Sequence, residues 1–211
     1  MKSIRYWAFC GNEGTGKTVL SKSFSDIING YWTYEPNGET FLLKTLRMSA
    51  LTRDPEMTVM GREMLLLANR SIHHAGLVDK IINNGGSVVT DRSFFSGMVY
   101  AKLNGIPFEK WFDMYLMSGI KNIPDALIFV KNKNQNIDKE EDNIYDHASL
   151  STLKKIDLIY KEGLDFIREY KSTKHIQIIE FNNSFDRSVS ENVDILISEI
   201  KKKLNLSDNS L

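Results

Sequence analysis

An octapeptide near the amino end of the chain limits the possible folds more than any other feature of the sequence: Gly11-Asn12-Glu13-Gly14-Thr15-Gly16-Lys17-Thr18. It fits the pattern G-x-x-x-x-G-K-[ST], in which glycines let backbone N–H groups converge on the oxygens of a polyphosphate. An apolar run precedes it, and apolar residues spaced three or four apart follow it. This order predicts a strand, a phosphate-binding loop and a helix, with Lys17 reaching the β- and γ-phosphates and Thr18 facing Mg²⁺.

Strand-like and helix-like segments alternate along the rest of the chain. Apolar or β-branched runs typical of strands cover residues 4–10, 31–35, 87–91, 125–130 and 176–181. Helical spacing is expected over 38–50, from Pro55 to Gly85-Gly86, up to Tyr100, and over 108–117, 150–167 and 189–204. The alternation predicts a mostly parallel five-stranded sheet, with ligands beyond the carboxyl ends of the strands. Glu35, Asp91 and the glycine loop fall at those ends.

Composition excludes several classes of protein. A length of 211 residues suits one α/β domain, and Lys+Arg and Asp+Glu are both 27, so no basic field favours nucleic acid. The single cysteine, Cys10, forms no internal disulfide or metal cluster and is expected to pack in the core. No stretch approaches the roughly 20 apolar residues that span a bilayer, and the first strand leaves no room for a signal peptide. We therefore expect a cytoplasmic protein without membrane or nucleic-acid partners.

The pair Asp91-Arg92 is the second signal of chemistry. An acid at the end of a strand beside a phosphate-binding loop can hold the Mg²⁺ shell or orient an attacking oxygen. The guanidinium of Arg92 can bind a second phosphate through two oxygens. A surface ion pair in which Asp91 caps a helix would give the same spacing, so the pair alone leaves both interpretations open.

Further blocks follow the glycine loop in order: Tyr34 to Thr40, Leu65 to Arg70, Asp91 to Tyr100, Pro124-Asp125 and Tyr145-Asp146. From the first strand to the last helix, their order and approximate spacing resemble the thymidylate kinase family, whose members move the γ-phosphoryl group of ATP onto dTMP. The resemblance implies a P-loop kinase fold, a three-layer α/β/α domain spanning 1–211 with a short lid at about 131–147. It also implies ATP as donor, Mg²⁺ bound by Thr18 and Asp91 through water, and dTMP or a related deoxynucleoside monophosphate as acceptor.

The resemblance also suggests roles for single residues. Residues 11–18 would bind ATP, and the catalytic residues would be Lys17, Arg92, Asp91 and Glu13. The acceptor site would contain Glu35, Arg70, Arg92, Ser96, Tyr100, Tyr145 and Leu66. Arg70 and Arg92 would clamp the acceptor phosphate, and Glu13 and Glu35 would face the sugar or the Mg²⁺ shell. Tyr100 would press on the deoxyribose and Tyr145 would close from the lid, although core packing would also explain either tyrosine. The family is commonly homodimeric.

The sequence departs from the family pattern at several positions. Leu66 stands where a phenylalanine usually stacks on thymine, Tyr34 replaces an arginine, and Cys10 replaces a common glutamate. Neither the glycine loop nor residues 131–146 contain the catalytic arginine of the family. The cations in or beside that segment are Lys131, Lys133 and Lys139. Phosphoryl transfer is therefore expected, and the preferred base stays open.

Three alternatives remain at this point. A deoxynucleoside kinase would share Gly11-Asn12 and Asp91-Arg92-Ser93, but Cys10 replaces its usual base and a base-reading glutamine is missing. A nucleotide-binding switch would need Asn-Lys-x-Asp, whereas residues 131–134 lack the Asp. A modifier of bases within DNA would fit the change at Leu66, but the neutral net charge opposes it.

Other features are interpreted as structural. His73 and His74 are neighbours in an expected helix and should point apart, which disfavours a shared metal. Trp111, Phe112 and Tyr115 have helical spacing and are expected in the core or on a dimer face.

Overall fold

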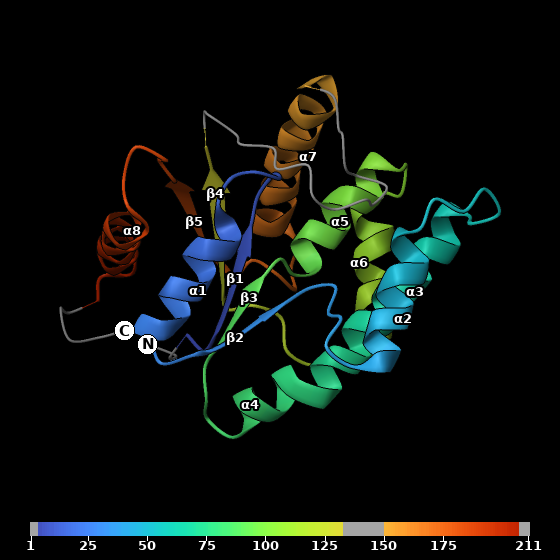
Figure 1. Cartoon of the computed structure of the whole chain (residues 1–211), viewed down its shortest axis with the longest axis horizontal. Coiled ribbons are helices and arrows are strands. Elements are labelled where there is room, and N and C mark those ends of the chain that lie inside the picture. The colour runs from blue at the N-terminus through green and yellow to red at the C-terminus, as the bar shows by residue number, and fades with distance from the viewer. Residues whose placement is uncertain (1–3, 133–149, 207–211) are drawn as a thin grey trace.

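The computed structural model describes residues 4–132 and 150–206, and these form a five-stranded sheet between two layers of helices (Figure 1). The strands are β1 (Tyr6–Cys10), β2 (Tyr31–Tyr34), β3 (Val88–Asp91), β4 (Ala126–Lys131) and β5 (Gln177–Asn182). Their order is β2-β3-β1-β4-β5, and every neighbouring pair is parallel. The five expected strands are thus confirmed, and the sheet is parallel throughout.

Helices connect the strands. They are α1 (Lys17–Ile27), α2 (Phe41–Leu51), α3 (Val59–His73), the π-helical turn η1 (His74–Val78), α4 (Asp79–Asn83), α5 (Phe94–Leu103), α6 (Phe108–Met117), α7 (Leu150–Glu169) and α8 (Val189–Leu204). Several begin at side-chain caps: Thr40 accepts a hydrogen bond from the backbone of Leu43, and Ser188 forms a capping box with Glu191. The helical stretch expected after Pro55 consists of three consecutive elements, α3, η1 and α4, with the π-helical turn in the middle.

Alternate side chains of β1 build two separate cores. Trp7 and Phe9 pack with α1, β5 and α8, whereas Ala8 and Cys10 pack with α5, α6 and α7. Figure 1 shows the corresponding arrangement, with α1 and α8 on one side of the sheet and α5, α6 and α7 on the other. A central strand buried on both faces reads as a continuous apolar run, which explains why residues 4–10 carry no alternation. This is the three-layer α/β/α architecture.

The strand register brings the chemical groups to one edge of the sheet. Asp91 at the end of β3 is level with Phe9 of β1 and with Tyr34 of β2. The glycine loop follows β1 at this same edge, as expected for a parallel sheet. Most of the predicted lid, residues 133–147, lies outside the described residues. Within the described ranges, every helix is too short or too polar to cross a bilayer.

Candidate active site

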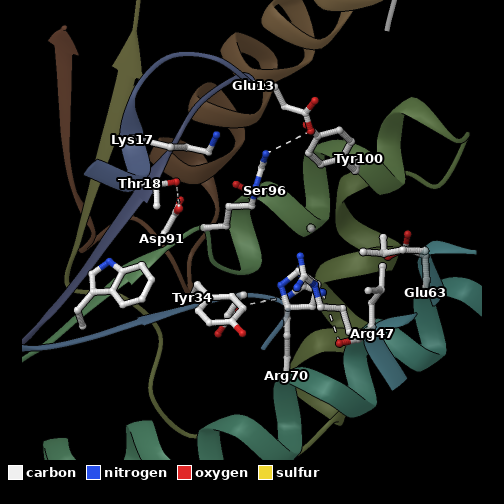
Figure 2. A pocket seen from close by; sticks show the side chains of 17 residues that line it. Glu13, Lys17, Thr18, Tyr34, Arg47, Glu63, Arg70, Asp91, Ser96 and Tyr100 are labelled. Carbon is white, nitrogen blue, oxygen red and sulfur yellow. Dashed lines mark hydrogen bonds and ion pairs between the residues drawn. The ribbon is translucent and has the colours of Figure 1, made fainter. Parts of the chain in front are cut away.

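A cavity of about 430 Å³ lies at the carboxyl ends of β1, β2 and β3. The site residues expected from the sequence that line it are Glu13, Lys17, Thr18, Glu35, Leu66, Arg70, Asp91, Arg92, Ser96 and Tyr100. Figure 2 shows Lys17, Thr18 and Asp91 on one side of this cavity and Arg70 on the opposite side. Tyr145 falls in the part of the chain that the structure does not describe.

The glycine loop has the backbone that its sequence predicts. Gly11 and Gly16 have φ angles of 145° and 79°, in the region that side chains rarely adopt. A Cβ atom at Gly11 would collide with the carbonyl oxygen of Val130, and one at Gly16 would lie 2.5 Å from Nδ2 of Asn183. Only glycine fits at these two positions. The loop therefore turns tightly into α1, and the first N–H groups of a helix are a suitable site for an anion.

Segments distant in the sequence hold the loop from behind. Nδ2 of Asn12 donates to the carbonyl oxygen of Leu153 at 3.0 Å and to Asp157 at 3.1 Å, both on α7. The hydroxyl of Tyr160, also on α7, lies 3.1 Å from the carbonyl oxygen of Gly11. Because its side chain is occupied in this way and is buried, Asn12 can serve a phosphate only through its backbone.

On the other side of the loop, Nδ2 of Asn183 donates to the carbonyl oxygen of Thr15 at 2.8 Å. Asn183 directly follows β5, and its own backbone N–H donates to Lys131 at the end of β4. The loop is thus fixed from α7 and from the ends of β4 and β5. A rigid cradle of this kind loses little entropy when it binds a polyphosphate.

Lys17 is the cation at the centre of the loop. Its Nζ lies 3.2 Å from the carbonyl oxygen of Asn12, and the residue is only 6% exposed. Burial and the neighbouring Arg92 lower the pKa of Lys17 to about 8, against the opposing effect of Asp91 and Glu13. A phosphate oxygen would favour the charged ammonium form, so Lys17 is suited to neutralise a bound polyphosphate.

Thr18 and Asp91 provide oxygen atoms of the kind that Mg²⁺ prefers. Oγ1 of Thr18 donates to Oδ2 of Asp91, which joins the first turn of α1 to the end of β3. Oδ1 of Asp91 is buried and has no hydrogen-bond partner among the described residues. No cluster of three or more His, Cys, Asp or Glu side chains that could hold a metal occurs in the described ranges. Thr18 and Asp91 are therefore the residues that would hold a Mg²⁺ ion here, which would supply positive charge beside a bound polyphosphate.

Arg92 directly follows β3 in a left-handed conformation with φ of 66°. Such a conformation is costly for a residue with a Cβ atom and often marks a functional site. Its Nη2 lies 3.5 Å from Oε1 of Glu13, and its guanidinium lies 5.5 Å from the centre of the Tyr100 ring. Nη1 is buried and has no hydrogen-bond partner in the described part of the chain. Arg92 therefore has donors left for an anion in the cavity.

Ser96 lines the same cavity but already has a partner. Its Oγ lies 3.1 Å from the hydroxyl of Tyr160, the group that also contacts the carbonyl oxygen of Gly11. Ser96 therefore connects α5 to α7 and to the glycine loop. A contact of this hydroxyl with the acceptor stays a prediction.

Glu35 and Arg70 meet in the wall of the cavity opposite the glycine loop. Nε of Arg70 lies 3.1 Å from Oε2 of Glu35, and both side chains are at most 3% exposed. Nε2 of His74 lies 2.9 Å from Oε1 of Glu35, and Nδ1 of His73 lies 3.7 Å from the same oxygen. Burial opposes ionisation of Glu35, but the two histidines and Arg70 outweigh it and lower the pKa of this carboxyl.

These contacts change the interpretation of Glu35. Both of its oxygens have protein partners, since Oε2 binds Arg70 and Oε1 binds His74. The expectation that it faces the acceptor stays a prediction. His73 and His74, placed on different faces by the sequence analysis, reach the same oxygen where the α-helix changes to a π-helical turn.

The cavity wall also contains residues that no sequence pattern indicated, among them Trp32, Arg47 and Glu63. Trp32 belongs to β2, Arg47 to α2 and Glu63 to α3, and no motif marks any of them. Arg47 and Glu63 reach the cavity from α2 and α3, which pack against each other, whereas Trp32 reaches it from the sheet itself. Of the three lysines expected in or beside the lid, Lys131 forms an ion pair with Glu180 at 2.5 Å. Lys133 and Lys139 lie outside the described residues.

Known proteins share sequence similarity with this chain. A family model described as thymidylate kinase matches residues 9–192. A probable thymidylate kinase of Methanococcus aeolicus is 30% identical over 127 residues, which is 60% of this chain and 60% of the relative. A thymidylate kinase of Campylobacter jejuni subsp. jejuni is 28% identical over 166 residues, covering 74% of this chain and 72% of the relative.

Solved structures share the fold. The thymidylate kinase of Candida albicans superposes with a TM-score of 0.70 at 17% identity, covering 96% of this chain and 93% of that one. The thymidylate kinase of Ehrlichia chaffeensis gives a TM-score of 0.66 at 17% identity, covering 94% and 99%. Since the family model spans most of the sequence, from the end of β1 into α8, this chain belongs to the thymidylate kinase family.

Proposed function

We propose that this protein transfers the γ-phosphoryl group of ATP to dTMP or a closely related deoxynucleoside monophosphate. One observation carries the proposal. A single cavity has Lys17, Thr18 and Asp91 of the phosphate-binding loop region on one side and the guanidinium groups of Arg92 and Arg70 in its remaining wall. Two anionic ligands can therefore meet in it, which is what phosphoryl transfer between nucleotides requires.

On the donor side, residues 11–18 bind the polyphosphate of ATP. Lys17 neutralises charge on the transferred group, and Thr18 with Asp91 holds Mg²⁺, mainly through water. Bound Mg²⁺ supplies charge neutralisation and fixes the positions of phosphate oxygens. The protein forms no covalent bond to the group that moves, so the rate depends on how well these side chains position and neutralise both nucleotides.

On the acceptor side, Arg92 binds the phosphate of the monophosphate, because it is next to Asp91 and close to Lys17. Glu13 orients Arg92, and Tyr100 packs beside it against the deoxyribose. Arg70 lies across the cavity from Lys17 (Figure 2). This position favours a contact of Arg70 with the base end of the acceptor, and the phosphate contact expected from the sequence stays a prediction.

The state of Cys10 favours a monophosphate over a nucleoside as acceptor. A nucleoside kinase needs a base that removes the proton of a 5′-hydroxyl. The thiol of Cys10 is fully buried, donates to the carbonyl oxygen of Ile128 at 3.5 Å, and has a pKa raised by burial. It cannot act as that base. An acceptor phosphate is already ionised and needs no base.

The function is tested by ADP release with Mg-ATP and a panel of deoxynucleoside monophosphates and thymidine. We expect turnover with dTMP, none with thymidine, and loss of turnover in Lys17→Ala. Turnover of thymidine in preference to dTMP would refute this proposal and favour a deoxynucleoside kinase. Folded, ATP-binding protein without turnover of any monophosphate would refute it. A homodimer and a cytoplasmic location stay predictions, which sedimentation and fractionation can check.

A further inference from the structure

Glu63 is a carboxyl group in the acceptor part of the cavity to which no role is assigned. It lies on α3, lines the cavity and is 1% exposed. Figure 2 shows it on the side away from Lys17, and the charge of Arg70 acts on it. A buried carboxyl is costly unless its oxygens have partners, so its position calls for a physical reason.

One of its two oxygens has such a partner. Nε1 of Trp111 donates to Oε2 of Glu63 at 2.7 Å, and within the described ranges this is the hydrogen bond that Glu63 makes. A carboxylate offers acceptor positions on both oxygens. Oε1 therefore keeps its capacity to accept from a ligand. Burial raises the pKa of Glu63, against the opposing effects of Trp111 and Arg70, so a ligand that donates to this group also relieves the cost of its charge.

Glu63 shares one helix face with Leu66 and Arg70, because residues three and seven positions apart on a helix point the same way. All three line the cavity. The guanidinium of Arg70 lies 5.7 Å from the centre of the indole of Trp111, whose N–H binds Glu63. The buried ring of Trp111 thus contacts both a hydrogen-bond acceptor and a hydrogen-bond donor of α3, and the apolar Leu66 lies between the two in the sequence.

Gly97 of α5 makes room for this arrangement. A Cβ atom there would lie 2.7 Å from Cζ2 of Trp111 and 2.8 Å from Nη2 of Arg70. Without a side chain at Gly97, the backbone of α5 packs directly against both the indole of Trp111 and the guanidinium of Arg70. Rigid placement is what a group needs if it is to distinguish ligands by hydrogen bonding.

We propose, building on the function above, that Glu63 determines base specificity by accepting a hydrogen bond from the ring N3–H of a thymine or uracil base. With the acceptor phosphate near Lys17 and Arg92, the base at the far end of the nucleotide reaches α3. Arg70 donates to the carbonyl oxygen beside the N3–H, and Leu66 packs on the ring. Cytosine presents a lone pair at N3, which a carboxylate repels, so the pair selects against dCMP.

The test compares dTMP with N3-methyl-dTMP, which lacks the ring N–H, as substrates of the wild type and of Glu63→Ala. In the wild type the methyl group should lower kcat/KM by about tenfold or more, because a hydrogen bond to a buried charged group is lost. In Glu63→Ala this penalty should largely disappear, since the partner is gone and the methyl group has space. Equal penalties in both proteins would overturn the proposal.

Glu63→Gln separates recognition from packing. The amide keeps an oxygen for Trp111 and also offers N–H donors, so the preference for dTMP over dCMP should fall while the thermal midpoint changes little. Met64→Ala, on the exposed side of the same helix, should leave both substrate ratios unchanged. An unaltered dTMP/dCMP ratio in Glu63→Gln would mean that Glu63 only supports Trp111. Absence of turnover with every monophosphate in the wild type would refute the proposed function as well. Turnover in which the N3-methyl group lowers kcat/KM equally in wild type and Glu63→Ala would refute only the role of Glu63.

Discussion

Nε2 of His74 lies 2.9 Å from Oε1 of Glu35, within the interior of the protein, and the opposite oxygen of Glu35 binds Arg70. The carboxylate therefore connects the π-helical turn after α3 to a guanidinium in the cavity wall. Buried charges of this kind persist only when each has partners, and removal of one partner leaves the other charge uncompensated. The contact thus supports the structure of this wall of the cavity.

Replacement of His74 by glutamine should lower the free energy of unfolding by about 3 kcal/mol near neutral pH, because Glu35 loses a charged partner. The groups that face His74 are Tyr6, Glu35, His73 and Asp79. Burial lowers the pKa of His74, but Asp79 and Glu35 outweigh it and raise this pKa from 6.5 to about 9. The proton is therefore held more tightly in the folded state than in the unfolded chain.

The sign of the pH dependence follows from that shift. The stabilisation is fully present below pH 6.5 and is lost as the pH rises through about 9. The difference between wild type and His74→Gln in urea unfolding should therefore shrink between these two pH values. His175→Gln, at an exposed position, is the matched control. A difference that stays constant from neutral to alkaline pH would show that His74 is not charged.

Lys17 should give the enzyme an alkaline limit. Its pKa of about 8 means that the free protein loses this positive charge above that pH. We expect kcat/KM for ATP to fall above pH 8, approaching tenfold per pH unit for a single ionisation. Lys17→Arg stays charged and should be less active, since the site is buried, but without that fall. The same alkaline profile in both proteins would assign the ionisation to another group.

The hydroxyl of Thr18 should matter for the metal rather than for the acceptor. Thr18→Val removes the donor to Asp91 and an oxygen that faces the phosphate loop. The concentration of Mg²⁺ that gives half-maximal rate should rise by about tenfold or more, as when oriented ligands of metal sites are removed. Thr18→Ser keeps the hydroxyl and should behave like the wild type. An unchanged Mg²⁺ requirement in Thr18→Val would contradict the assignment.

Gly97→Ala should weaken acceptor binding selectively. The added Cβ would meet Trp111 and Arg70, and no atom of the residues assigned to ATP is among its nearest neighbours. The KM for dTMP should rise by about tenfold while the KM for ATP stays the same, because an overpacked wall displaces the guanidinium. Gly76→Ala is the matched control, since nothing lies within 4 Å of its Cβ position. Equal changes in the two KM values would indicate general damage to the fold.

Local patterns predicted the strands and the phosphate loop because their physical causes are local. Apolar runs of strand length and glycines with positive φ angles are visible in the sequence itself. The order of the strands was not predicted, because it depends on how distant segments pair. The π-helical turn was not predicted either, since no residue type between His74 and Val78 marks it.

The candidate site divides in the same way. Lys17, Thr18, Asp91 and Arg92 belong to motifs, and all of them line the cavity. No sequence pattern distinguishes Glu63 from its helical neighbours, because only the packing of α3 against Trp111 shows which way its side chain points. The predicted role of Glu35 rested on motif position, whereas its partners come from a helix far along the chain.

The cavity is assembled from two kinds of structure, and this has an evolutionary consequence. The phosphate end is part of the central sheet and its first loop, where a substitution disturbs the cores on both faces. The proposed base end is carried by α2 and α3, a helical pair whose members pack against each other. If that proposal holds, a change of a few helix residues can alter which nucleobase is accepted without disturbing the central sheet.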